Sequence, residues 1–490
     1  MGGRRASGKR MSFFADIAFE AGLVARSIAD YVSGGALRLG VTGLSRAGKT
    51  VFVTALINNL IAGSRMPVLA ASAEGRISRV RLEPQPDDAV PRFAYEENLA
   101  TLNGADRRWP RSTRRVSQLR LRIEFERASA WGSSPTTLNL DIVDYPGEWL
   151  LDLPLLSKSY AQWSEETIAA SETSARAPLA AGWRARLTRL DPSAPADEEV
   201  ARECAALFTA YLRKARDDIY ALSTLPPGRF LMPGDLEGSP ALTFAPLPIA
   251  GDGEIAPGSL AAMMERRYEA YKTHVVRPFF RDHFSRLDRQ IVLVDALTAL
   301  NSGPAALRDL ENALSEVLGA FRAGRPSALA SIFRPRVDRI LFAATKADHL
   351  HHSSHDRLEA ILRVLTSKAI ARAEGVGAEI DVVALAAIRA TREAQIRHAG
   401  ETLDAIIGVP EAGEKLDGQT FDGVAEAAVF PGQLPEDPNA VFQGDAIALP
   451  EAENDWRFLR FRPPVSSRGA PAPHIRLDRA LQFLIGDKLA

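Results

Sequence analysis

Short hydrophobic runs alternate along the chain with longer segments in which apolar residues recur at helical spacing. The runs 37–42, 138–143, 291–294, 339–344 and 380–385 are largely apolar, and the first four are followed by a polar residue or glycine, so each run predicts a buried strand. Because strands that alternate with helices are typical of crossover connections, the pattern predicts a mostly parallel sheet flanked by helices.

A different pattern marks residues 118–125, where Leu119 and Leu121 alternate with Arg120. This period of two is typical of a strand that buries only one face. The segment 80–82 predicts a further short strand.

The remaining segments predict helices and loops, and with them the domain organisation. We expect helices over residues 12–32, 50–61, 198–222, 261–287, 305–321, 357–373 and 476–489. Residues 408–455 are rich in glycine, proline and acidic residues and predict a loop. The chain is thus expected to comprise an N-terminal helix, a first part of an α/β domain, an inserted mainly helical domain, and a second part of the α/β domain with a closing helix: residues 1–35, 36–149, 150–289 and 290–490.

Composition limits the partners and the cellular compartment that we expect for this protein. With 60 basic and 61 acidic residues among 490, the chain has no overall charge that would attract nucleic acid, so no specific nucleic-acid partner is expected. The single cysteine, Cys204, favours a reducing cytoplasm, and no apolar run is long enough to span a membrane. Arg4, Arg5, Lys9 and Arg10 precede the N-terminal helix, whose apolar face is expected to dock on the α/β domain or, as the alternative, to contact the inner membrane peripherally.

The strongest motif follows the first predicted strand. Residues 43–50 match G-x-x-x-x-G-K-T, in which backbone amides surround phosphate oxygens at the start of a helix. Lys49 is expected to contact the β- and γ-phosphates, and the Thr50 hydroxyl to ligate Mg²⁺. The expected phosphate-binding residues of this loop are Gly43, Ser45, Arg46, Ala47, Gly48, Lys49, Thr50 and Val51.

A second motif, Asp144-Tyr145-Pro146-Gly147, ends the strand 138–143. Asp144 is expected to hold Mg²⁺ through water, and the Gly147 amide to reach the γ-phosphate.

A third motif, Thr345-Lys346-Ala347-Asp348, also follows a strand. Its carboxylate is suited to accept hydrogen bonds from the ring N1–H and the exocyclic amine of guanine, a pair of donors that adenine lacks. Lys346 is expected along the base, and His349 follows directly. Further base contacts are expected after the strand 380–385, from an amide of Ala386 or Ala387 and from the side chain of Ile388.

The order of these motifs resembles the Ras-like GTPase superfamily. More narrowly, the chain resembles the YcjX-like family of bacterial stress-associated P-loop proteins, described as ATPases or GTPases. Three segments carry this resemblance: Trp109-Pro110-Arg111-Ser112-Thr113, Asp144-Tyr145-Pro146-Gly147-Glu148-Trp149-Leu150 and Thr345-Lys346-Ala347-Asp348-His349. The resemblance spans nearly the whole chain. It implies a Ras-like P-loop NTPase domain that binds GTP or GDP with Mg²⁺ and carries a helical insertion.

By position and by this resemblance, Thr113 is the expected switch residue that reaches Mg²⁺ or the γ-phosphate. Arg111 is a candidate for an arginine that stabilises the transition state in cis, although a solvated basic loop is the favoured alternative for any single arginine there. Glu148 stands where many relatives carry a glutamine that orients water, and its charge near the γ-phosphate predicts slow intrinsic turnover.

Four histidines fall in residues 349–355. They predict either a metal site or a polar loop, and we favour the loop because no second cysteine or carboxylate cluster nearby completes a tetrahedral set.

The sequence as a whole predicts a GTP-hydrolysing switch with an unidentified protein partner. A non-hydrolysing or ATP-using scaffold, whose helical insertion binds a partner, is the alternative.

Overall fold

The computed structural model describes residues 36–44, 46–85, 87–129, 132–217, 219–249, 255–319, 337–375, 377–398, 400–416, 418–443, 458–467 and 469–490. The predicted N-terminal helix, the proposed membrane contact and Ser45 lie outside these residues. Among the described helices, none combines the length and the apolar character that crossing a bilayer demands.

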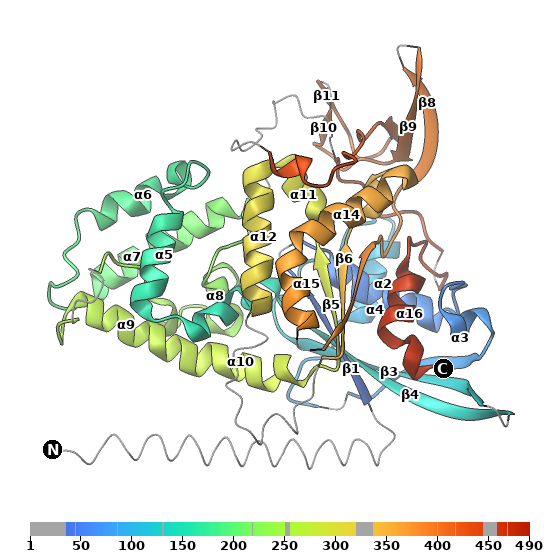
Figure 1. Ribbon diagram of the computed structural model, residues 1–490, viewed down its shortest axis with the longest axis horizontal. Coiled ribbons are helices and arrows are strands. Elements are labelled where there is room, and N and C mark those ends of the chain that lie inside the picture. Colours follow the sequence, from blue (N-terminus) through green and yellow to red (C-terminus); the bar gives the residue numbers. More distant parts are fainter. Residues whose placement is uncertain are drawn as a thin grey trace.

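A seven-stranded sheet in the order β2-β3-β4-β1-β5-β6-β7 forms the centre of the molecule (Figure 1). Strands β4, β1, β5, β6 and β7 run parallel, whereas β2, β3 and β4 pair antiparallel. The bounds are β1 Ala36–Gly43, β2 Ile77–Glu83, β3 Ser117–Ser129, β4 Gly132–Asp144, β5 Arg289–Val294, β6 Arg339–Ala344 and β7 Glu379–Ala384. The predicted fold class, a mostly parallel sheet flanked by helices, is confirmed.

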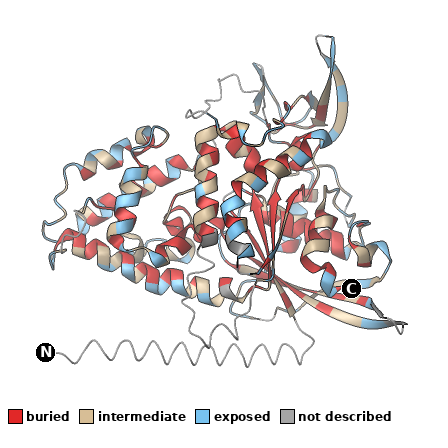
Figure 2. Cartoon of the chain, in the orientation of Figure 1, coloured by how far each residue is buried: buried red, intermediate tan, exposed pale blue. Residues whose placement is uncertain are grey.

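Helices cover both faces of this sheet, and alternate residues of one strand face opposite sides. On β5, Ile291 and Leu293 pack with α2 and α16, while Val292 and Val294 pack with α12 and α14. The covering helices are α2 Lys49–Ile61, α3 Ala70–Ala73, α4 Tyr95–Asn103 and α16 Leu477–Ile485 on one face, and α11 Ala296–Asn301, α12 Pro304–Gly319, α14 His355–Leu365 and α15 Ser367–Glu374 on the other. Burial on both faces explains why the central strands are continuously apolar (Figure 2).

A helical region lies between β4 and β5 in the sequence and to one side of the sheet (Figure 1). After the 3-10 turns η1 Gly147–Ser157 come α5 Tyr160–Ala170, α6 Ala177–Leu187, α7 Glu198–Ala215, α8 Gly228–Leu231, α9 Leu260–Tyr271 and α10 Arg277–Asp282. Its core is aromatic: Trp163 stacks on Tyr268 at a centroid distance of 5.1 Å, and Trp183 stacks on Tyr211 at 5.5 Å. Ser159 forms a capping box at the start of α5, and the Asp197 side chain caps α7. The large helical insertion of the predicted fold class is confirmed.

Several predicted helices differ in extent. The predicted helix 357–373 is two helices, α14 and α15, separated at Thr366, whose hydroxyl donates to the Leu362 carbonyl. The predicted helix 261–287 is interrupted by a π turn at residues 272–276, next to Pro278, which has no amide hydrogen for a regular helical bond. The predicted helix 198–222 ends at Ala215.

The prediction of a loop over residues 408–455 is wrong for part of that segment. The segment contains a hairpin, β10 Lys415–Leu416 and β11 Gln419–Thr420, and the strand β12 Ala427–Val429. Strand β12 belongs to a small sheet with β9 Glu401–Gly408 and β8 Arg392–His398. The small sheet and the hairpin lie above the main sheet in Figure 1. No residue from 392 to 397 is buried, so β8 carries none of the hydrophobic alternation that would have predicted it.

Candidate functional site

The three motifs follow strands that end at one edge of the sheet. In the parallel registers, Val41 pairs with Asp144, Val294 with Ala344, and Ala344 with Ala384. Strands β2, β3 and β4 lie on one side of β1, and β5, β6 and β7 lie on the other. The order of strands therefore reverses at β1, and ligands of α/β sheets bind at the carboxyl ends of the strands at such a point.

A cavity of about 250 Å³ lies at this edge. It connects the P-loop with the Thr345–Asp348 motif and with the segment after β7. The predicted residues that line it are Arg46, Ala47, Gly48, Lys49, Thr50, Val51, Thr113, Glu148, Lys346, Asp348, His349, Ala386, Ala387 and Ile388. Gly43, Asp144 and Gly147 lie behind this lining, in contact with it.

The P-loop backbone is shaped by positive φ angles at Arg46, 66°, and Gly48, 79°. Gly48 precedes the first residue of α2, so the amino end of that helix, with its positive dipole, faces the cavity. The buried Lys49 ammonium donates to the carbonyls of Gly43, at 2.8 Å, and Leu44, at 3.2 Å. Burial lowers the pKa of Lys49, against the pull of Glu148 and Asp144. Within the described part of the chain its hydrogen bonds go to neutral carbonyls, so this buried cation is suited to receive a phosphate oxygen.

Three oxygen-bearing side chains meet beside Lys49. The hydroxyls of Thr50 and Thr113 are 3.1 Å apart, and Thr113 donates to Asp144 Oδ2 at 2.5 Å. The other carboxylate oxygen, Oδ1, is buried and has no hydrogen-bond partner among the residues that the structure describes. Burial raises the pKa of Asp144 to about 6. Two hydroxyls and an unsatisfied carboxylate oxygen are the hard oxygen donors that Mg²⁺ prefers, so these residues fit that ion.

Gly147 lies directly against the P-loop. A Cβ atom at this position would stand 1.9 Å from the Gly43 carbonyl oxygen and 2.7 Å from Lys49 Nζ, so only glycine fits. The next residue, Glu148, is 4% exposed, and its carboxylate is 3.2 Å from Arg216 Nη2. Arg46 Nη1 in turn donates to the Arg216 carbonyl at 3.2 Å.

Arg216, the C-cap of α7, is therefore a basic group at this site that sequence reasoning missed. It belongs to the helical region and to no motif, so no local signal marks it. Neither Arg216 nor the predicted Arg111 lines the cavity, but the Arg216 guanidinium contacts Glu148, which does. The Arg111 side chain is exposed, and its carbonyl lies 3.4 Å from the Thr50 hydroxyl.

The Asp348 carboxylate lies at the other end of the cavity and is 4% exposed. It accepts a hydrogen bond from the Ala390 amide at 2.8 Å, which orients it. Lys346, with φ of 62°, forms an ion pair of 2.6 Å with Asp295, which also caps α11 through the Thr298 amide. The Thr345 hydroxyl donates to the Val294 carbonyl.

Residues 37–489 match the profile of the YcjX-like family, DUF463. This chain belongs to the YcjX-like family. A relative from Escherichia coli (strain K12), named "Ras-like GTPase YcjX", is 41% identical over 465 residues, which cover 92% of this chain and 96% of the relative. A relative of the same name from Shewanella oneidensis is 35% identical over 486 residues, with coverage of 92% and 94%. The predicted family is confirmed.

In this member of the YcjX-like family, the end of the cavity near Asp348 includes residues that the sequence did not predict. They are Glu411, Arg460 and Phe461, from segments far along the chain. The Phe461 ring meets the buried His349 ring edge-on at 5.4 Å, and burial lowers the pKa of His349. Nothing in the sequence places these segments beside residues 345–349.

The expected base-contacting amides are only partly available. The Ala386 amide donates to the Ile475 carbonyl at 3.1 Å, which leaves Ala387 as the candidate donor.

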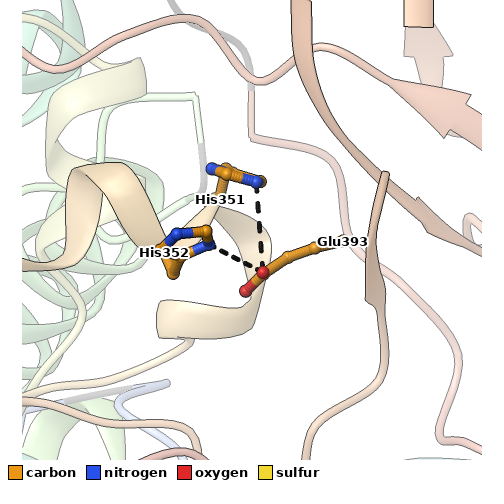
Figure 3. A group of neighbouring side chains, drawn as sticks. All are labelled: His351, His352 and Glu393. Atoms are coloured by element: carbon orange, nitrogen blue, oxygen red, sulfur yellow. Dashed lines mark hydrogen bonds and ion pairs between the residues drawn. The ribbon is translucent and has the colours of Figure 1, made fainter. Parts of the chain in front are cut away.

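The histidine segment of this family member divides into different environments. His349 lines the cavity, and His355 Nε2 is 2.9 Å from the Ala347 carbonyl. His351 and His352, however, lie with Glu393 of β8 (Figure 3). The prediction of a polar loop rested on the lack of a second cysteine or a carboxylate cluster that completes a tetrahedral set. It did not include Glu393, because that residue comes from a strand that was not predicted.

Proposed function

We propose that this protein binds GTP with Mg²⁺ in the cavity at the carboxyl edge of the sheet, hydrolyses it to GDP and phosphate, and acts as a nucleotide-dependent switch. The observation that carries the proposal is that one cavity joins the P-loop and Lys49 to the buried Asp348 carboxylate. The names of both relatives, Ras-like GTPase, support it. The resemblance adds the expectation that the switch serves a stress response.

In the proposed complex, the P-loop amides and Lys49 hold the phosphates, and Thr50, Thr113 and Asp144 hold Mg²⁺. When bound, the ion neutralises charge that develops on the phosphate oxygens. Lys49 exchanges its two carbonyl partners for phosphate oxygens, and the Gly147 amide approaches the γ-phosphate. Thr113 and Gly147 lie on separate loops that both meet the P-loop, so loss of the γ-phosphate releases both loops.

We further propose that Arg216, rather than Arg111, supplies positive charge to the transition state. Its ion pair with Glu148 offsets a carboxylate that would otherwise repel the γ-phosphate. Because Arg216 ends α7, residues 150–289 act on the nucleotide-binding parts, 36–149 and 290–490, through this contact.

Base selectivity tests the nucleotide assignment. We expect Asp348→Asn to weaken GTP binding roughly 100-fold, because two hydrogen bonds to a charged acceptor are lost, and to shift preference toward XTP. Displacement of a fluorescent GTP analogue by GTP, ATP and XTP measures both effects. Asp356→Asn, an exposed aspartate on α14, is the control and should leave the ranking unchanged. Equal displacement by ATP and GTP from the native protein would refute the assignment and favour the ATP-using alternative.

Turnover is tested separately from binding. We expect the protein to release phosphate slowly from pre-bound GTP in a single-turnover experiment. Tight GTP binding without phosphate release would instead identify a non-hydrolysing scaffold.

A further inference from the structure

Two histidines and a glutamate lie together outside the nucleotide cavity (Figure 3). His351 and His352 begin the 3-10 turn η8 His352–Ser354, and Glu393 lies on β8. His352 Nδ1 is 2.7 Å and His351 Nε2 is 3.9 Å from the same oxygen, Glu393 Oε2. One carboxylate oxygen therefore faces two imidazole nitrogens.

We propose that His351, His352 and Glu393 bind a transition-metal dication such as Zn²⁺. Imidazole nitrogens and a carboxylate oxygen are ligands that Zn²⁺ uses, and three protein ligands leave a fourth position for water. Zinc bonds of roughly 2.0–2.2 Å in tetrahedral geometry place ligand atoms about 3.3 Å apart. The three ligand atoms here lie within 4.8 Å of one another, and the His352 side chain is 66% exposed, so rotation of that side chain closes the set.

The surroundings of the cluster orient its ligands. His351 Nδ1, the ring nitrogen on the side away from Glu393, is 2.9 Å from Ser353 Oγ and 3.3 Å from Asp404 Oδ2, and it accepts a hydrogen bond from the Ser353 amide at 3.4 Å. When Nε2 binds a metal ion the ring proton lies on Nδ1, and a neighbouring carboxylate there raises the basicity of the ligand. Ser353 Oγ donates to the same Asp404 oxygen at 3.2 Å.

Arg389 is the cation that faces this cluster. Its Nη2 atom is 3.3 Å from Glu393 Oε1, so it holds the carboxylate with Oε2 toward the imidazoles. Its charge also repels a dication, and we therefore expect zinc affinity in the micromolar range rather than that of a structural zinc site.

A metal ion at this position would link η8 to β8. Both segments are close in sequence to contacts of Asp348. The turn η8 begins four residues after Asp348, and Ala390, whose amide donates to the Asp348 carboxylate, lies just before β8. The binding of the metal itself does not depend on the proposed GTP function.

Calorimetric titration of ZnCl₂ into the full-length, chelator-treated protein, without nucleotide, tests the site. We expect one zinc ion per chain. His352→Ala and Glu393→Gln should each weaken binding at least 10-fold, and Asp404→Asn roughly 10- to 100-fold. His274→Ala, which removes an exposed histidine in the π turn, is the control and should leave the affinity unchanged.

Absence of zinc binding to the native protein would overturn the proposal. Zinc binding that persists in both His352→Ala and Glu393→Gln would also overturn it, because the ion would then occupy another place, such as the Asp144 cluster. Circular dichroism of each variant verifies the fold. We expect the fold to be preserved, because His352 is exposed and glutamine has the same shape as Glu393.

Discussion

Asp152 is a buried carboxyl group where η1 meets α8. Its Oδ1 accepts from the Gly228 amide and its Oδ2 from the Tyr271 hydroxyl, each at 2.7 Å. Burial nevertheless raises the pKa of Asp152 to about 7. The folded protein thus keeps a proton on this group at pH values where the unfolded chain, with an ordinary aspartate pKa of about 3.9, has released it.

This difference predicts how stability depends on pH. The stabilisation linked to Asp152 is fully present below about pH 4 and is lost as the pH rises toward 7, by on the order of 4 kcal/mol. In Asp152→Asn this loss is absent, so the free energy of unfolding of the native protein should fall relative to that of the variant as the pH rises. Urea unfolding at pH 4.5 to 8 measures it, with the exposed Asp88→Asn as the control. A constant difference between native protein and Asp152→Asn across this range would contradict the assignment.

At the scale of elements, the junction between β4 and η1 decides how closely the second motif approaches the P-loop. Gly147 contacts the Gly43 carbonyl, and a Cβ atom at Gly228 of α8 would stand 1.7 Å from the Glu148 carbonyl oxygen. The backbone from residue 147 to 148 is thus enclosed between the P-loop and α8, and neither Gly147 nor Gly228 has room for a side chain.

Gly147→Ala is expected to displace this junction. A methyl group there overlaps the Gly43 carbonyl and crowds Lys49 Nζ, so affinity for a fluorescent GTP analogue should fall by at least 10-fold. Gly182→Ala is the control, because no atom lies within 4 Å of the added methyl group in the middle of α6, where alanine stabilises a helix by about 1 kcal/mol. Unchanged affinity in a folded Gly147→Ala protein would show that the nucleotide does not require this close approach.

At the scale of the whole molecule, the helical region contacts a residue that lines the cavity, Glu148, through Arg216. The guanidinium is bound to Glu148, next to the second motif, and its backbone carbonyl is bound to Arg46 in the P-loop. In the proposed complex, a movement of the helical region would therefore change the charge near the phosphates, and the proposal predicts that a partner protein bound to this region would alter turnover.

Arg216→Ala is expected to lower the single-turnover rate of GTP hydrolysis roughly 10³-fold, because the charge that offsets Glu148 is lost, while GTP affinity changes much less. Arg213→Ala, an exposed arginine of the same helix, should retain the native rate. Hydrolysis at the native rate in Arg216→Ala would remove the helical region from the mechanism.

The strand ends and their motifs were predictable because their chemistry is local. The P-loop, Asp144 and Asp348 each follow directly from a buried apolar strand, and parallel strands bring their carboxyl ends together whatever the rest of the chain does. Hydrophobic period, however, does not encode the direction of pairing. The antiparallel arrangement of β2, β3 and β4 therefore could not be inferred, nor could β8, which has no buried residue from 392 to 397 and carries too few apolar residues to mark a strand.

The amino-acid sequence by itself determined the family, the fold class and the three motifs that meet at one edge of the sheet, because each rests on neighbours in the chain. Only the tertiary structure decided which distant groups complete the sites. The contacts that complete them join residues far apart in sequence: Arg216 with Glu148, Phe461 with His349, and Glu393 with His352. Such contacts depend on how whole elements pack, and a charged or aromatic side chain carries no local sign of the partner it will meet.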